Sequence, residues 1–449
     1  MTTDFAALLG DAARDDEITG ASFAYWGGQR LETAVAGLRN SVTRDPVTPD
    51  TLMHIGSITK LFNTVLLMQL VDDGLISLDD PVVRHLPDLK LGDMEALQQI
   101  TCRMLVNHTS GIDGDMPDDH GPDQERIVDA IDRCSSMGQL HVPGQATSYS
   151  NIGTVIAGYL SQRLRGMSWY SLVKRRLFEP LEMTYSLVDV SEAPRFRVSI
   201  GDQVDAAGKL VQSGKPFLPL SFAPCGTTAM MTASDLMIFA RALLNNGEGP
   251  NGRRILSAKA AAQMAQETAT FAAPESLRVG LGWMLLPGGV LTHSGGGPGV
   301  WSSLYAHPAS GRIFVILTNS ARLNALKASL IDPILRDWTG LTSTLPSRLP
   351  MTADTSRYGG WYENSAFRVE IFSENGRLFG RGALKVDHYE TMAGEHPAVE
   401  LHRIGEDRFE ASSLLPGLGT DEIAFVGTDV EGRMQAMSWL ARLLVRRGA

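Results

Sequence analysis

The stretch Gly56-Ser57-Ile58-Thr59-Lys60, followed at once by the apolar run LFNTVLLMQLV, most constrains how this chain can fold. A small residue, a serine and a lysine three positions later, ahead of apolar residues at helical spacing, predict Ser57 in the first turn of a buried helix that ends near Gly74. Residues i and i+3 share a helix face, which places the Lys60 amine beside the Ser57 hydroxyl. Burial favours the neutral, proton-accepting amine, and such a base can turn a hydroxyl into a nucleophile. Taken alone, the pattern also fits a helix N-cap serine with a solvated lysine.

Two further stretches add groups that such a serine would need. Tyr149 and Asn151 lie in a loop before an apolar helix; the phenol could relay a proton as base and then acid, and the amide could donate to a substrate carbonyl and contact Lys60. His293-Ser294-Gly295-Gly296 ends an apolar strand, where glycines permit close backbone approach and an N–H could face an oxyanion. Individually, these stretches also fit a turn with a packed tyrosine and a Gly-rich turn.

SxxK, YxN and HxG in this order resemble the serine β-lactamase and penicillin-binding-protein superfamily, in its class C-like branch. Further stretches at about residues 10–340 resemble landmarks of that branch: NHTSGI (107–112), PGQATSYSNIG (143–153), FEPLEM (178–183), GTTAMMTASDL (226–236), GLGW (280–283), HSGGGPG (293–299) and VILTN (315–319). The resemblance implies that Ser57 is the acylated nucleophile, Lys60 its proton acceptor and Tyr149 the catalytic phenol. It further implies that Asn151 orients the substrate and the lysine. The implied oxyanion hole is formed by the N–H groups of Ser57 and Gly296, with Ser294 and Gly295 near the substrate.

His293 departs from that pattern, because β-lactamases and penicillin-binding proteins usually carry lysine there. A lysine is a permanent cation that helps to hold a substrate carboxylate, whereas histidine is largely neutral at pH 7. The departure argues against β-lactam hydrolysis. It favours relatives that resemble esterases, D-aminopeptidases and thioesterases.

The pattern of apolar and polar residues along the chain predicts two domains, the first α+β and the second all-β. The resemblance implies a β-lactamase/transpeptidase-like catalytic domain over 1–341, an antiparallel sheet flanked by helices with a helical subdomain. The Ser/Thr/Pro-rich stretch 342–356 reads as a linker, and alternating apolar and polar runs over 357–449 predict a small all-β barrel. Locally, we expect a helix from Thr101 to Gly111 and a surface loop over 113–123.

Charge, apolar runs and cysteine content indicate which partners and cofactors to expect. Lys plus Arg number 40 against 50 Asp plus Glu, and no basic cluster is interleaved with aromatics, so nucleic acid is not an expected partner. The N-terminal residues do not resemble a signal peptide and no apolar run is long enough to span a membrane, so we expect a cytoplasmic protein without a membrane partner. Three widely separated cysteines and the lack of HExxH or CxxC spacing predict buried thiols, no metal and no cofactor.

The combination of this catalytic domain with a β-rich second domain resembles the penicillin-binding-protein-type thioesterases of nonribosomal peptide pathways, whose second domain is lipocalin-like. The resemblance implies a peptidyl thioester as substrate, a peptidyl carrier protein as possible partner, head-to-tail macrolactamisation or hydrolysis, and a D-residue at the acylated C-terminus. The alternatives are a cytoplasmic family VIII-type carboxylesterase or a D-amino-acid amidase or aminopeptidase, then a β-lactamase, then a non-catalytic binding protein. Arg446 and Arg447 would either reach the substrate or form a solvated basic tail.

Overall fold

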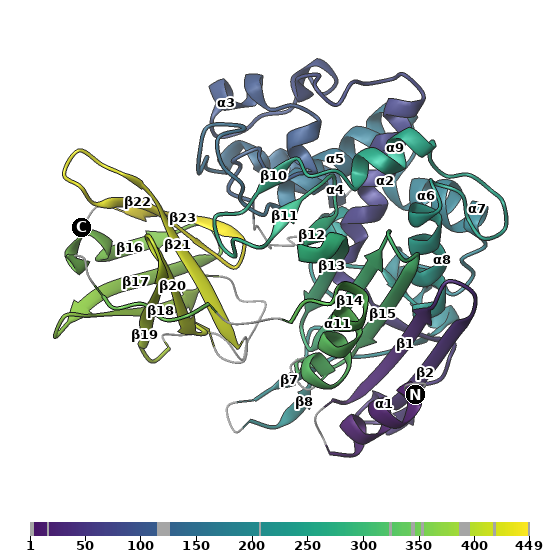
Figure 1. The fold of residues 1–449 in the computed structure, drawn as a ribbon. Helices are drawn as coiled ribbons and strands as arrows, with labels where there is room; N and C mark the ends of the chain where they lie inside the picture. Colours follow the sequence, from purple (N-terminus) through teal and green to yellow (C-terminus); the bar gives the residue numbers. More distant parts are fainter. Residues whose placement is uncertain are drawn as a thin grey trace.

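The computed structural model describes a helix-and-sheet part followed by a β-barrel (Figure 1). The described residues are 4–15, 18–114, 126–205, 208–322, 326–342, 346–351, 354–385, 396–415 and 419–447. Most of the surface loop expected over 113–123 lies outside them.

A nine-stranded antiparallel sheet forms the centre of the first part, in the order β10-β11-β12-β13-β14-β15-β1-β2-β3. Strand β15 pairs with β1, so the two ends of the catalytic part meet in the middle of the sheet. The strands are β1 (Gly20–Trp26), β2 (Leu31–Asn40), β3 (Asp45–Pro46), β10 (Ala269–Thr270), β11 (Arg278–Val279), β12 (Met284–Leu286), β13 (Val290–Gly297), β14 (Val300–His307) and β15 (Arg312–Thr318).

Alternating side chains along these strands supply two apolar layers. Phe314 and Ile316 of β15 pack in a cluster with α1 (Phe5–Arg14) and α11 (Asp332–Thr339), whereas Val315 and Leu317 pack in the larger core on the opposite face. This is the period-two pattern of a strand buried on both faces. The sheet is therefore covered by helices on each side, as Figure 1 shows.

The larger core is built around α2 (Thr59–Asp72), in which every residue from Thr59 to Leu70 is buried. A helix that is buried around its whole circumference belongs in a core, so the predicted buried helix is confirmed, except that Ser57 lies in the 3₁₀ turn that precedes it. Around it lie α3 (Met94–Gln99), α4 (Arg126–Arg133), α5 (Asn151–Arg165), α6 (Trp169–Val173), α7 (Glu179–Leu181), α8 (Ala233–Leu244) and α9 (Ala258–Met264). The short strands β4 (Thr51–His54), β5 (Ser186–Leu187), β6 (Arg197–Val198), β7 (Asp202–Val204), β8 (Leu210–Gln212) and β9 (Met230–Met231) form two small sheets.

The helix expected over 101–111 is wrong. Only a 3₁₀ turn at Arg103–Leu105 forms there. The chain then takes positive φ angles at His108 (63°) and Gly111 (75°), which no right-handed helix allows. The consequence is a buried loop that carries His108 into the site described below.

The second part is a closed barrel in which each of the eight strands pairs with its neighbour and β16 pairs with β23. Its own apolar core includes Tyr362, Phe409 and Trp439. The strands are β16 (Gly360–Glu363), β17 (Phe367–Glu374), β18 (Arg377–Leu384), β19 (Val399–Gly405), β20 (Arg408–Ser412), β21 (Thr420–Thr428), β22 (Met434–Trp439) and β23 (Arg442–Arg447). The predicted fold class, an α+β catalytic fold followed by a small barrel, is confirmed.

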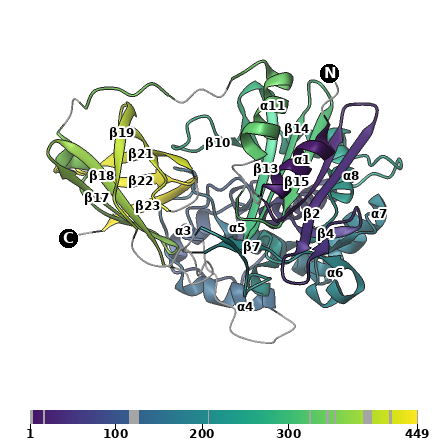
Figure 2. The same cartoon turned by 90° about the horizontal axis from the view of Figure 1, so that it is seen from below.

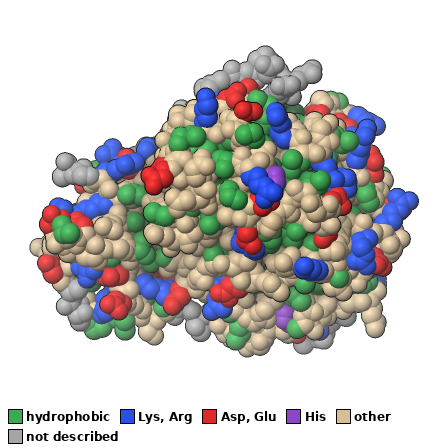
Figure 3. Space-filling model, turned by 90° about the horizontal axis from the view of Figure 1, so that it is seen from above, with side chains coloured by type: hydrophobic (Ala, Val, Ile, Leu, Met, Phe, Trp, Pro, Cys, Tyr) green, Lys and Arg blue, Asp and Glu red, His purple; other side chains and the backbone are tan. Residues whose placement is uncertain are grey.

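The segment after α11 leads from the catalytic part to the barrel, which Figure 2 shows from below. The helix α11 ends at Thr339 and the first barrel strand begins at Gly360. The exact domain limits at 341 and 357 stay a prediction. Seen from above, basic and acidic side chains are interspersed over both parts (Figure 3). Among the described residues, none of the helices is both long and apolar enough to cross a membrane.

Candidate active site

Ser57 and Lys60 lie at the start of α2, shortly after the end of the short strand β4. A 3₁₀ turn, Gly56–Ile58, precedes the helix and presents the serine, and Lys60 is on the following turn. The Nζ atom of Lys60 lies 3.0 Å from Oγ of Ser57 and donates to the carbonyl oxygen of Cys225 at 2.8 Å. Lys60 is 2 % exposed. The amine is thus held against the hydroxyl and kept away from bulk water.

The ring of Tyr149 lies over the amine of Lys60. Its centroid is 4.8 Å from Nζ of Lys60, 4.5 Å from the ring of His108 and 6.4 Å from the ring of His293. Asn151 is the first residue of α5, two positions beyond the tyrosine, and Ser150 caps that helix by accepting from the N–H of Gly153. The structure therefore brings Ser57, Lys60, Tyr149 and His293 together; the contact expected between Asn151 and Lys60 stays a prediction.

Backbone from β13 approaches the serine from the other side. A β-carbon built on Gly56 would lie 2.7 Å from the nitrogen of Gly296, and one built on Gly295 would lie 2.0 Å from the carbonyl oxygen of Ile55. Strand β12 pairs with β13 only over Val290–Thr292, so no described strand pairs with that edge beyond residue 292. The N–H groups of Ser57 and Gly296 thus belong to segments in close contact, the arrangement that an oxyanion hole needs.

His293 is a neutral hydrogen-bond acceptor in this site. Burial, and next the charge of Lys60, lower its pKa to about 3, and the hydrogen bond to the carbonyl of Ser294 only partly opposes them. Because that carbonyl, 2.8 Å from Nδ1, can only accept, the ring proton is on Nδ1 and Nε2 carries a free lone pair. Nε2 is buried and has no hydrogen-bond partner among the described residues. It can accept a hydrogen bond from a substrate.

Ser294 and Gly295 alternate across β13. The Ser294 hydroxyl lies 3.0 Å from the Ser303 hydroxyl on β14, while Ser302 donates to the carbonyl of Ile55 at 2.7 Å. Since neighbouring side chains of a strand point to opposite faces, Gly295 lies on the face toward Ser57 and Ser294 on the other.

Two further buried histidines support the site, and sequence reasoning did not single them out. His54 accepts from the N–H of Gly56 at 3.1 Å and contacts the carbonyl of Thr227 at 3.0 Å, and burial lowers its pKa to about 4. His108 accepts from the N–H of Ser150 at 3.3 Å, and burial, followed by the charge of Lys60, holds its pKa well below the usual value. In the sequence, both could have been recognised as polar residues that lie close to a motif and next to apolar residues.

The barrel also contributes to the site, though through other residues than expected. Arg446 donates to the carbonyls of Arg357, Gly359 and Met434 within the barrel, and Arg447 pairs with Glu363 at 3.0 Å. Both side chains are thus bonded within the barrel, which does not support the alternative in which they contact the substrate. Instead, the guanidinium of Arg442, on the same strand, lies 4.8 Å from the ring centroid of Tyr149.

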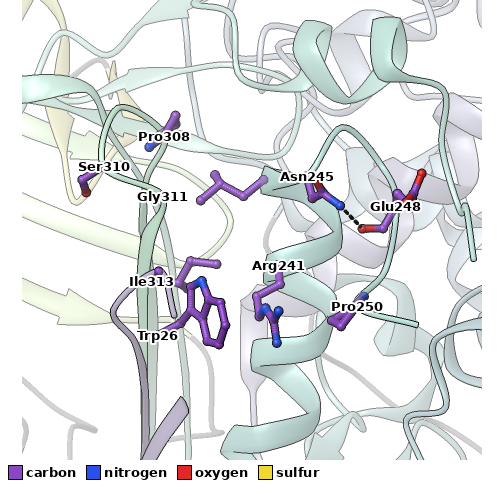
Figure 4. A pocket seen from close by; sticks show the side chains of 11 residues that line it. Trp26, Arg241, Asn245, Glu248, Pro250, Pro308, Ser310, Gly311 and Ile313 are labelled. Atoms are coloured by element: carbon purple, nitrogen blue, oxygen red, sulfur yellow. Dashed lines mark hydrogen bonds between the residues drawn. The ribbon is translucent and has the colours of Figure 1, made fainter. Parts of the chain in front are cut away.

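A separate hollow of about 470 Å³ lies near the turn that joins β14 to β15 (Figure 4). Its wall includes Trp26 and Arg241, whose guanidinium is 3.7 Å from the indole ring. None of the predicted site residues lines it. Among the described residues, no group of three His, Cys, Asp or Glu side chains is arranged to hold a metal ion.

Comparison with known proteins agrees with this geometry. Residues 5–335 match the family described as Beta-lactamase. Penicillin-binding protein 4 of Amycolatopsis lactamdurans is 32% identical over 370 residues, which are 79% of this chain and 95% of that protein. The crystal structure of SurE matches with a TM-score of 0.77 and 25% identity over 98% of both chains. That of the D-amino acid amidase from Ochrobactrum anthropi SV3, complexed with L-phenylalanine amide, matches with a TM-score of 0.59 and 25% identity over 72% of this chain and 97% of that one. This chain therefore belongs to the β-lactamase and penicillin-binding-protein superfamily of serine hydrolases.

Proposed function

We propose that this protein is an acyl-transferring serine enzyme in which Ser57 carries the acyl group. The observation that carries the proposal is the 3.0 Å contact between the Ser57 hydroxyl and the buried amine of Lys60, with the ring of Tyr149 above that amine. A serine is a weak nucleophile unless an adjacent base accepts its proton. This arrangement supplies the base and a second proton carrier.

In the first half-reaction, Oγ of Ser57 attacks the carbonyl carbon of the donor and its proton passes to Lys60. The negative charge that develops on the carbonyl oxygen is stabilised by the N–H groups of Ser57 and Gly296. The bond to the leaving group then breaks, and the leaving thiolate, alkoxide or amine receives the proton through the Tyr149 hydroxyl. The product is an ester of Ser57.

In the second half-reaction, an amine or water attacks that ester. The nucleophile loses one proton, which passes through Tyr149 to Lys60, and Oγ of Ser57 takes that proton as its bond to the acyl carbon breaks. The free lone pair of His293 supports an N–H donor in this step, because a neutral imidazole accepts a hydrogen bond that a lysine cation could not accept.

We further propose that the donor is a peptidyl thioester, delivered by a peptidyl carrier protein, and that the acceptor is the peptide's own amine, which gives a macrolactam. The support is the barrel, which completes the two-domain arrangement that resembles thioesterases of nonribosomal peptide pathways and which lies against Tyr149.

A peptidyl N-acetylcysteamine thioester with a C-terminal D- or L-residue tests the proposal. We expect a mass increase at Ser57, lost in Ser57→Ala, and cyclic product chiefly from the D-substrate. Hydrolysed peptide alone, together with faster turnover of simple esters, would reject the cyclase proposal and leave the esterase.

The second candidate is a D-amino-acid amidase, favoured by the likeness to the amidase from Ochrobactrum anthropi SV3. Turnover of D-phenylalanine amide, compared with the L-amide in the same assay, tests it. Ammonia release from the D-amide that exceeds the rate of thioester turnover would favour the amidase.

A further inference from the structure

The turn between β22 and β23 leaves the barrel and contacts the segment that carries Tyr149. The backbone N–H of Tyr149 donates to the carbonyl oxygen of Ala441 at 2.8 Å. The N–H of Leu443 donates to Oγ of Ser148 at 3.0 Å. These two bonds hold consecutive residues of the catalytic loop against the barrel, so the backbone position of Tyr149 depends on this turn.

The turn adopts a backbone that its residues disfavour. Leu440 and Ala441 have φ angles of 50° and 59°. A two-residue hairpin turn with two positive φ angles is most often Asn-Gly, because a β-carbon is disfavoured in that conformation. Strain of this kind persists only where surrounding contacts fix the conformation.

The contacts that fix it come from the catalytic part. Ala441 packs against the apolar cluster of Phe271, Val279 and Met284, to which Tyr149 also belongs. In Figure 1, the yellow end of the barrel accordingly reaches β10 and β11. Next along the chain, the guanidinium of Arg442 lies 4.8 Å from the ring centroid of Tyr149. The turn thus contacts both the backbone and the ring of the tyrosine.

Other bonds between the two parts do not touch the tyrosine. Ser365 donates through its N–H and its hydroxyl to the carboxylate of Asp113, at 3.0 and 2.6 Å. The N–H of Ala273 donates to Oγ of Ser438 at 3.2 Å. These bonds attach the barrel to the catalytic part, and they allow attachment to be tested separately from the placement of Tyr149.

We propose that the barrel turn 440–443 is the positioning element for Tyr149, acting through Ser148 and the carbonyl of Ala441. The proposal rests on the proposed function, in which the Tyr149 hydroxyl relays the proton. The tyrosine comes from the catalytic part, but the barrel sets where its hydroxyl lies relative to Ser57 and Lys60. Ser148 and the turn are positioning residues, because they touch neither the acyl group nor the nucleophile.

Ser148→Ala and Ser438→Ala in the full chain form a matched pair. Each removes one buried serine oxygen that accepts from a backbone N–H across the same domain contact. The readout is the burst of Ser57 acylation by p-nitrophenyl acetate in stopped flow, resolved into the acylation rate constant and the half-saturating concentration, beside the melting temperature.

We expect Ser148→Ala to lower the acylation rate constant about tenfold, because small misplacements of a reacting group have large effects on rate, with the half-saturating concentration unchanged. Ser438→Ala should leave the acylation rate constant within about twofold of the wild-type value. It should lower the melting temperature by about as much as Ser148→Ala does. Equal rate effects in the two variants, or a Ser148→Ala rate constant within twofold of wild type, would overturn the proposal.

If Ser148→Ala does not fold, Ala441→Gly tests the same element, because glycine tolerates the positive φ and only the packed methyl is lost. It should slow acylation about threefold without lowering the melting temperature, and an unchanged rate would refute the positioning role. A wild-type chain that p-nitrophenyl acetate does not acylate at Ser57 would refute the proposed function itself, and this inference with it.

Discussion

The glycine before the nucleophile gives the sharpest test of the site. Gly56 has a φ angle of 51°, and a β-carbon built on it would lie 2.7 Å from the backbone nitrogen of Gly296 and 2.9 Å from Cα of Gly295. These neighbours are backbone atoms of β13 and cannot rotate away. Gly56→Ala therefore has to push the strand that carries one oxyanion donor away from the turn that carries the other.

Two separate effects set the magnitude. A left-handed φ disfavours a residue with a β-carbon by roughly 1–2 kcal/mol, which reduces stability. Displacement of Gly296 weakens a hydrogen bond that is formed in the transition state, and loss of one oxyanion donor lowers kcat about 10²–10³-fold. We expect Gly56→Ala to fold with reduced stability and to acylate Ser57 on the order of a hundredfold more slowly.

Gly74→Ala is the matched control. Gly74 has a φ angle of 69°, but a β-carbon there would have no heavy atom of a described residue within 4 Å. It should lose comparable stability in thermal unfolding and keep wild-type acylation of Ser57 in stopped flow. If Gly56→Ala acylates within about threefold of Gly74→Ala at an equal folded fraction, the close approach of β13 does not build the oxyanion hole.

Further outcomes follow from the same geometry. Lys60→Met should keep the fold, because Lys60 is buried in an apolar helix, but should lower acylation of Ser57 about 10³-fold or more, measured by intact mass after a timed pulse with an activated ester. His293→Leu removes the free acceptor and should shift a peptidyl thioester from cyclic toward hydrolysed product, measured by chromatography, whereas His293→Gln should restore part of the cyclic fraction. Burial lowers the pKa of His54 to about 4, so between pH 6.5 and 4 the unfolded chain binds the proton and the folded chain does not. The contribution of His54 to stability is thus complete above about pH 6.5 and is lost as the pH falls, by on the order of 3 kcal/mol at pH 4. Urea unfolding at pH 7.5 and 4.5 should show that His54→Gln loses less free energy of unfolding between the two pH values than the wild type does. An equal loss in the two proteins would contradict the assignment.

Local pattern was enough to predict the centre of the site. The spacing of Ser57 and Lys60 fixes their common helix face, and the apolar run after them places that face in the core. Tyr149 and His293 were predictable only because three motifs occurred in order. Alternating residues beyond the linker were enough for a barrel, since a strand's two faces are visible in its own sequence.

What escaped prediction depends on contacts between distant segments. His108 lies in an irregular loop that was expected to be helical, because positive φ at a histidine leaves no mark in hydrophobic periodicity. Arg442 was not singled out, because the sequence alone does not show which residue of the barrel lies next to the hairpin tip that reaches Tyr149. The neutrality of His293 follows from burial and from the nearby Lys60, and neither is visible in its strand.

The hydrogen bond between Leu443 and Ser148 spans 295 residues. Chains are synthesised from the N-terminus at about 5–20 residues per second, and domains fold as they emerge. The catalytic part, predicted to end near residue 341, therefore leaves the ribosome about 100 residues ahead of the barrel turn, or roughly 5–20 s at that rate. During that interval the N–H of Tyr149 lacks its acceptor, the carbonyl of Ala441. The catalytic part can therefore fold before Tyr149 is held in its place beside Ser57 and Lys60. Newly made protein would acylate Ser57 slowly until the turn between β22 and β23 reaches Tyr149.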